Sequence, residues 1–181
     1  RGNIRYARNS VTTSGEDSNL SLGVNSFFGK KSGSATINEF DDASLEKVVR
    51  RAEELAQLAP ENPEFMDPLS QQNYGAEGKT WSDATANVTP EFRAQAAADS
   101  INPAVPKNVT AAGYLQDSRN FTSIANNKGL FAYSKSTSVE FTVTMRSNDG
   151  TGSGWAAQDL NDASKLRTGE VSKIASDKDV Q

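Results

Sequence analysis

The glycine strip Gly150-Thr151-Gly152-Ser153-Gly154 is the segment whose residue types and spacing come closest to a binding motif. Glycine backbones can cradle phosphate oxygens, but a Walker loop also needs Gly-Lys-Ser/Thr and a following helix, and neither is present. We therefore interpret the strip as a flexible turn that lets the backbone pass close to another element. Trp155 follows directly, so Gly152, Gly154 and Trp155 are the candidate residues for a ligand or peptide groove. The more ordinary role of Trp155 is core packing, and we expect that role.

Two groups of carboxylates have a composition that suits a metal ion. Glu39, Asp41 and Asp42 are close in sequence, but a helix follows them, and its N-cap accounts for Asp41 or Asp42. Residues 159–162 hold two aspartates and an asparagine, yet the DxDxDG spacing and the terminal glutamate of a calcium loop are missing. We therefore predict no metal-binding residue in this chain.

The chain contains no histidine and no cysteine. A Ser-His-Asp triad, a histidine general base and a zinc site with His or Cys ligands therefore cannot be built from its residues alone. The remaining candidates for chemistry are carboxylates, lysine, tyrosine, Ser/Thr and backbone groups, and these form no recognisable catalytic motif. We predict no catalytic or cofactor-binding residue, and we do not expect this chain alone to be an enzyme.

The composition is that of an ordinary folded protein. The 181 residues are 35% apolar and carry a formal charge of −4, with a sequence pI of about 5.0. This balance argues against a nucleic-acid binder, which would usually present a basic face. No stretch approaches the length of apolar residues that spans a membrane, and the lack of cysteine fits the cytoplasm. We therefore expect a cytoplasmic protein that binds neither a membrane nor nucleic acid.

Hydrophobic periodicity predicts mixed secondary structure. The first forty residues predict a meander of about three strands, and further strands are expected at 109–116, 121–126 and 129–134. The clearest strand starts at Val139, where Val139, Phe141, Val143 and Met145 alternate with polar residues and predict one buried face.

Two helices are predicted from their caps and apolar spacing. One begins at Asp41 or Asp42 and ends before Pro60, and the other has Thr89 as N-cap and ends before Pro103. The irregular stretch 61–87 is expected to wrap the surface. Its predicted anchors are Phe65, Met66, Leu69, Tyr74 and Trp81.

Together these elements predict an α+β fold. We expect a two-layer sandwich, with a largely antiparallel sheet and two main helices on one face. The aromatic residues of the predicted strands are best explained as packing residues. They are Tyr6, Phe27, Phe28, Tyr114, Phe131 and Tyr133.

Five stretches of the chain together resemble the N-terminal domain of the TldD/PmbA family, whose members are also called modulators of DNA gyrase. The stretches keep the family's order and spacing over roughly residues 1–157. They are NIRYARNSVTTSGEDSNLSLGV, FGKKSGSATINEFDDASLEKVVRRAEELAQLAPENPE, TAAGYLQ, IANNKGLFAYSKSTSVEFTVTMR and GSGWA. The combination is fairly specific, although no single piece is a strict motif.

The resemblance implies more than the composition does. Full family members are longer, and a β-rich C-terminal domain follows this one. TldD-type members are metalloproteases that bind zinc through HExxxH and a later cysteine. The TldE/PmbA-type partner lacks that site, and the two form a heterodimer that processes peptides. Because this chain has no His or Cys, any zinc would lie in a missing domain or a partner subunit, and no family ligand transfers to it.

The resemblance also sets our expectations for domains and function. We expect a TldD/PmbA-type α+β domain over residues 1–157, and the start of a linker toward a missing C-terminal domain over 158–181. The FGK, LAPENPE and GSGWA segments favour the PmbA/TldE side. We therefore expect a non-catalytic scaffold that forms a peptide groove or a homo- or heterodimer in a peptide-processing system. The parent protein would be a metalloprotease or its inactive partner.

Two alternatives belong to other functional classes. One is a free-standing structural or binding module with no role in proteolysis. The other is a gyrase-linked regulator, which the family name suggests and the acidic charge does not support.

Overall fold

The computed structural model describes residues 1–76 and 78–179, and its contacts divide the chain into two compact units. The first unit comprises Arg1–Asp17 and Gln72–Gln181, and the second comprises Ser18–Gln71. The chain therefore forms the first two strands of the first unit, then the whole of the second unit, and then returns to the first unit. The boundary predicted at Ala157 stays a prediction. The described residues that follow it fold within the first unit.

The second unit is a β-hairpin covered by one helix. Its elements are β3 (Leu22–Phe28), β4 (Lys31–Ile37) and α1 (Asp42–Leu58). The predicted N-cap is confirmed, because the Asp41 side chain accepts a hydrogen bond of 3.0 Å from the Ser44 N–H. A Cβ at Gly33 would lie 2.2 Å from the backbone nitrogen of Ala56, so only glycine allows α1 to approach β4 this closely.

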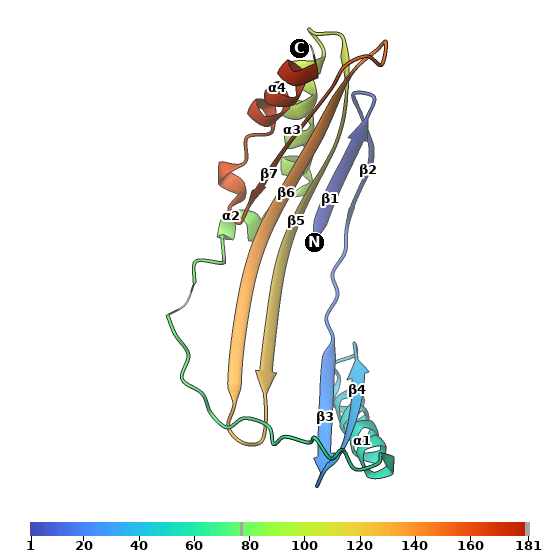
Figure 1. The fold of residues 1–181 in the computed structure, drawn as a ribbon, viewed down its shortest axis with the longest axis vertical. Coiled ribbons are helices and arrows are strands. Elements are labelled where there is room, and N and C mark those ends of the chain that lie inside the picture. The colour runs from blue at the N-terminus through green and yellow to red at the C-terminus, as the bar shows by residue number, and fades with distance from the viewer. Residues whose placement is uncertain (77, 180–181) are drawn as a thin grey trace. The chain divides into compact units, whose positions relative to one another are not determined.

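The first unit is a sheet with helices on one face (Figure 1). Within the described residues its strands follow the order β2-β1-β5-β6-β7, and every neighbouring pair is antiparallel. The strands are β1 (Gly2–Ala7), β2 (Ser10–Glu16), β5 (Val109–Ala125), β6 (Phe131–Ser147) and β7 (Ser153–Leu160). The helices are α2 (Asp83–Ala86), α3 (Pro90–Ile101) and α4 (Thr168–Asp179), with 3-10 turns η1 (Asn102–Ala104) and η2 (Ala163–Lys165).

The core of this unit lies between the sheet and the helices α3 and α4. α3 packs on β1 and β5, α4 packs on β6 and β7, and the two helices contact each other. The alternation predicted for β6 is confirmed, because Val139, Phe141, Val143 and Met145 are all buried. The α+β class with a largely antiparallel sheet is therefore correct. The second helix on this face is α4, whereas the predicted helix α1 covers the β3–β4 hairpin.

Several local predictions were wrong in detail. The strands predicted separately at 109–116 and 121–126 form one continuous strand, β5, and β6 likewise runs unbroken from Phe131. The predicted meander of about three strands is two hairpins: β1 and β2 join at Arg8-Asn9, both at positive φ, and β3 pairs with β4 in the second unit. The predicted anchors Met66, Leu69 and Tyr74 are exposed.

The aromatic residues that were predicted to pack in the strands differ in how far they are buried. Tyr6 is fully buried, as expected for strand packing. Phe27 and Phe28 in the second unit, and Phe131 and Tyr133 in the first, are exposed. Packing as the explanation of Phe28, Phe131 and Tyr133 is therefore wrong, whereas Phe27 packs against Phe65 with the ring centroids 5.6 Å apart. Phe131 and Tyr133 lie on a strand segment that no described helix of the first unit covers, whereas Phe27 and Phe28 lie at the end of β3 beside the hairpin turn.

Candidate functional site

The three residues predicted to line a groove lie together at the start of β7. Gly152 closes the turn after β6, where its carbonyl accepts the Ser147 N–H at 3.2 Å. Gly154 is buried on the core face opposite Met145. Trp155 points to the other face and is 58% exposed, so its predicted place in the core is wrong.

β7 is an edge strand, and its backbone is open on the side away from β6. It pairs with β6 alone among the described strands. The Trp155 carbonyl accepts a hydrogen bond of 3.2 Å from the Lys178 ammonium of α4 rather than completing a ladder. Backbone groups of alternate residues face the same edge of a strand, so Trp155 and Ala157 present theirs at the open edge. An extended chain can pair with such an edge.

A shallow polar hollow of about 820 Å³ lies beside the start of this strand. The two lysines that line it are held by neighbours, because Lys107 pairs with Asp177 at 2.5 Å and Lys178 contacts Trp155. The lining residues come from the β5 start, the β6–β7 turn and the end of α4. They are Lys107, Asn108, Val109, Ser147, Asn148, Asp149, Thr151, Gly152, Ser153 and Lys178.

The glycine strip forms a turn at the rim of this hollow, as expected, but a Cβ at Gly150 would meet no atom within 4 Å, so no close approach to another element requires that glycine. Gly150 has a φ of +79°, and its N–H bonds to the Ser147 carbonyl at 3.0 Å. A strand follows the turn, not the helix that a phosphate loop requires. The Thr151 N–H, followed by the Ser147 and Thr151 hydroxyls, lowers the pKa of Asp149 to about 2. The Asp149 carboxylate therefore organises the turn.

The carboxylates that resembled metal ligands also have structural partners. Asp41 caps α1, and Glu39 accepts a hydrogen bond of 3.1 Å from the Ser44 hydroxyl. Asp162 accepts hydrogen bonds from the backbone and hydroxyl of Ser164 at the start of η2, which lowers its pKa. Within residues 1–76 and 78–179, no three Asp or Glu side chains gather as metal ligands would.

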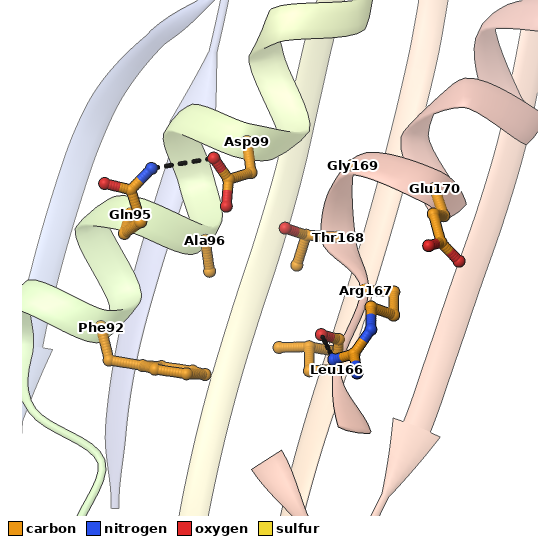
Figure 2. Close-up of a pocket in the computed structure, with 9 residues that line it drawn as sticks. All are labelled: Phe92, Gln95, Ala96, Asp99, Leu166, Arg167, Thr168, Gly169 and Glu170. Atoms are coloured by element: carbon orange, nitrogen blue, oxygen red, sulfur yellow. Dashed lines mark hydrogen bonds between the residues drawn. The ribbon is translucent and has the colours of Figure 1, made fainter. Parts of the chain in front are cut away.

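A second hollow, of about 400 Å³, lies between α3 and the start of α4 (Figure 2). Figure 2 shows the side chains of Ala96 and Thr168 facing each other from the two helices. Three of its polar side chains are bound locally, since Gln95 donates to Asp99 at 2.8 Å and Arg167 donates to the Leu166 carbonyl at 2.9 Å. The hollow therefore has the features of a packing surface between the two helices. This hollow could not be predicted from the sequence, because α4 carries only weak apolar periodicity.

The buried polar groups of the first unit connect its helices to its sheet. Arg93 of α3 is 4% exposed and pairs with Asp117 of β5 at 2.5 Å and with Glu16 of β2 at 2.6 Å. Burial lowers the pKa of Arg93, but the hydrogen bonds to Asp117 and Glu16 outweigh that effect and keep the pKa above its ordinary value. The guanidinium lies over Gly2, where a Cβ would be 1.9 Å from it.

A chain of buried hydroxyls forms the second such connection. Tyr6 of β1 hydrogen-bonds to Ser100 of α3, and Ser100 hydrogen-bonds to Ser172 of α4 at 2.6 Å. Burial raises the pKa of Tyr6 to about 12, so the phenol stays protonated and cannot act as a base near neutral pH. These hydroxyls therefore hold the layers together.

Comparison with known proteins agrees with this fold. Residues 1–56 match the model of PmbA/TldA metallopeptidase domain 1, and residues 85–180 match that of the PmbA/TldA metallopeptidase central domain. A search of curated protein sequences returned no match. No helix in the described part of the chain is both long and apolar enough to cross a membrane.

Solved structures share the fold at low sequence identity. TldE from Thermococcus kodakarensis matches 98% of this chain with a TM-score of 0.83 and 14% identity. A proposed modulator of DNA gyrase from Thermotoga maritima matches 99% of the chain, with a TM-score of 0.79 and 14% identity. This chain spans 41% of the length of each of these proteins. With both domain models matched in order along the sequence, the chain belongs to the PmbA/TldD metallopeptidase family.

Proposed function

We propose that this chain is a non-catalytic part of a peptide-processing metalloprotease system, on the PmbA/TldE side of the family. In this role it holds an extended peptide at the open edge of β7. The peptide bond is cleaved at a zinc site in another domain or in a TldD-type partner subunit. The family supports the connection to proteolysis, and the chain itself has no His or Cys with which to bind zinc.

The open edge of β7 is the observation that carries this proposal. A peptide pairing at this edge would bond to the Trp155 N–H and to the backbone groups of Ala157, while the Trp155 carbonyl keeps its hydrogen bond from Lys178. The exposed Trp155 ring lies on the same strand and offers apolar contact to alternate side chains of that peptide. The polar hollow at the strand start leaves room for the peptide's end.

A proline on β7 tests the role of the edge. Ala157→Pro removes an N–H and adds ring bulk at the open side, whereas Ala157→Ser keeps the backbone donor. In the full-length protein with a TldD-type subunit, we expect Ala157→Pro to reduce hydrolysis of fluorescein-labelled casein about tenfold through a higher KM. Ala157→Ser should match the unmodified protein. Equal rates for both variants would show that the peptide lies elsewhere.

The non-catalytic role has its own test. The full-length protein without its partner is assayed on the same casein, with and without EDTA. We expect no hydrolysis in the presence of EDTA, because cleavage is assigned to zinc. Hydrolysis that persists in EDTA and is retained by the chain Arg1–Gln181 would overturn the non-catalytic assignment.

A further inference from the structure

The outer part of the β5–β6 hairpin, residues 118–138, extends past the helical layer of the first unit. We call this segment the distal ribbon. The helical layer ends at the pair Arg119–Thr137, where Arg119 donates to the Ala86 carbonyl of α2 at 2.9 Å and the Ser82 N–H donates to Thr137 at 2.9 Å. Residues 119–125 are all exposed. Beyond this pair the distal ribbon is two-stranded, and no described helix of its own unit lies on it.

One face of the distal ribbon carries three exposed aromatic side chains. The buried face of β6 continues outward through every second residue to Tyr133 and Phe131, and that of β5 continues to Phe121. These three side chains are 56–63% exposed. A two-stranded ribbon has no core of its own, and exposed aromatic clusters on soluble proteins mark contact surfaces. This face therefore has the properties of a contact surface.

The charge of the distal ribbon is opposite to that of the rest of the chain. It contains Arg119, Lys128 and Lys135 and no Asp or Glu, so its formal charge is +3. The whole chain carries −4, which leaves −7 on the remaining residues. Phe121 is the register partner of Lys135, so apolar and cationic groups share one face. A partner must then supply apolar groups together with carboxylates.

Nucleic acid fits this face less well than acidic polypeptide does. Lys135 lies 4.7 Å over the Trp81 ring and Arg119 donates to the Ala86 carbonyl, so both side chains are held against the chain and do not form a broad basic face. Binding of nucleic acid would need a broad basic face, whereas this surface offers three cations among apolar side chains. An acidic polypeptide offers a few carboxylates between apolar side chains, and these carboxylates can pair with the three cations.

We propose that the distal ribbon is a docking surface for an acidic polypeptide segment that carries apolar side chains. This goes beyond the proposed function, because it concerns strands other than β7 and does not require a peptide at that edge. Phe121, Phe131 and Tyr133 make the apolar contacts. Arg119, Lys128 and Lys135 attract the carboxylates.

Fluorescence anisotropy with two short labelled peptides tests the chemistry of the partner. One peptide alternates glutamate with leucine and the other alternates lysine with leucine. The full-length protein should bind the glutamate peptide about tenfold more tightly than the lysine peptide, and added salt should weaken that binding. Equal affinity for both peptides, tighter binding of labelled oligothymidylate, or no saturable binding would each overturn the proposal.

Variants on the two faces of the ribbon locate the surface. The double variant Phe131→Ser/Tyr133→Ser should weaken binding of the glutamate peptide about tenfold. Ile124→Ser changes an equally exposed side chain on the opposite face and should leave binding unchanged. Lys128→Glu at the hairpin loop should weaken it severalfold, and Lys47→Glu, an exposed charge reversal on α1, should not.

Two further outcomes separate this proposal from its alternatives. Ala157→Pro on β7 should leave glutamate-peptide binding by the distal ribbon intact, so failure of either proposal can be recognised separately. Sedimentation of the unmodified protein and of Phe131→Ser/Tyr133→Ser reports on self-association. Self-association that the double variant abolishes, without peptide binding, would assign the surface to a second copy and overturn the proposal.

Discussion

The ring of Tyr6 lies directly over Gly113 on the neighbouring strand, so that a Cβ at Gly113 would be 2.1 Å from the Tyr6 Oη. Ser100 of α3 hydrogen-bonds to the same hydroxyl, and the ring cannot move aside without breaking that bond. This glycine therefore lets a large side chain of β1 cross the face of β5.

Gly113→Ala is expected to destabilise the first unit by about 1–3 kcal/mol or more, because the added methyl group overpacks a buried site. Urea denaturation followed by circular dichroism measures the change. Gly15→Ala on the exposed strand β2 is the matched control, since its Cβ would meet no atom within 4 Å. The prediction fails if both variants unfold at the same urea concentration.

The buried pair between Arg93 and Asp117 predicts a large mutational effect. Arg93→Met leaves the Asp117 carboxylate, 7% exposed, without its cation, and should cost about 3–5 kcal/mol of unfolding free energy. Arg93→Met/Asp117→Leu should recover a large part of that loss, since no uncompensated charge stays buried. The exposed pair of Arg50 and Glu53 is the comparator, and Arg50→Met should change little. A double variant no more stable than Arg93→Met would contradict this account.

The parts of the fold that local chemistry determines could be predicted from the sequence. The alternation from Val139 to Met145 identified a buried strand face, because the period of a strand is independent of its neighbours. The predicted N-caps Asp41 and Thr89 were also correct. A cap depends on local sequence alone, because each side chain accepts a hydrogen bond from an N–H only three residues away. The family could also be predicted from the sequence, through stretches that include Asp41 and the strand from Val139 to Met145.

The parts that depend on tertiary contacts could not be predicted. Arg8 and Asn9 form a tight turn with positive φ because the Asn9 side chain bonds to Val109 and Ala111 of β5, far away in sequence. The exposure of Trp155 follows from which face of β7 the helix α4 covers. A strand pattern alone does not fix that choice.

The candidate site was predicted only in part. Gly152, Gly154 and Trp155 do lie together, since they are neighbours in sequence, but the open edge beside them depends on strand order. The distal ribbon was missed because Lys135 and Thr137 occupy positions of the apolar face between Tyr133 and Val139, so one long strand was interpreted as two short ones.

The turn at Asp149 predicts a dependence of stability on pH. Hydrogen bonds from the Thr151 N–H and from the Ser147 and Thr151 hydroxyls lower the pKa of Asp149 from 3.8 to about 2. A lowered folded-state pKa stabilises the protein above the unfolded value, and this contribution disappears as the pH falls through about 2. The difference in unfolding free energy between the unmodified protein and Asp149→Ala should thus be constant above about pH 4 and shrink below it. Urea titrations at several pH values measure this difference, and a gap independent of pH would refute the assignment.

Two serines one turn apart on α4 predict opposite effects of the same substitution. The Ser172 hydroxyl bonds to Ser100 at 2.6 Å, whereas the buried Ser176 hydroxyl has no hydrogen-bond partner within the described part of the chain. Ser172→Ala should lower the unfolding free energy by about 1–2 kcal/mol, because Ser100 loses a buried partner. Ser176→Ala should raise it by up to about 1 kcal/mol, since it removes an unsatisfied buried hydroxyl and alanine favours the helix. Thermal and urea unfolding of the two variants provide the comparison. Equal destabilisation by both would mean that Ser176 has a partner in solution.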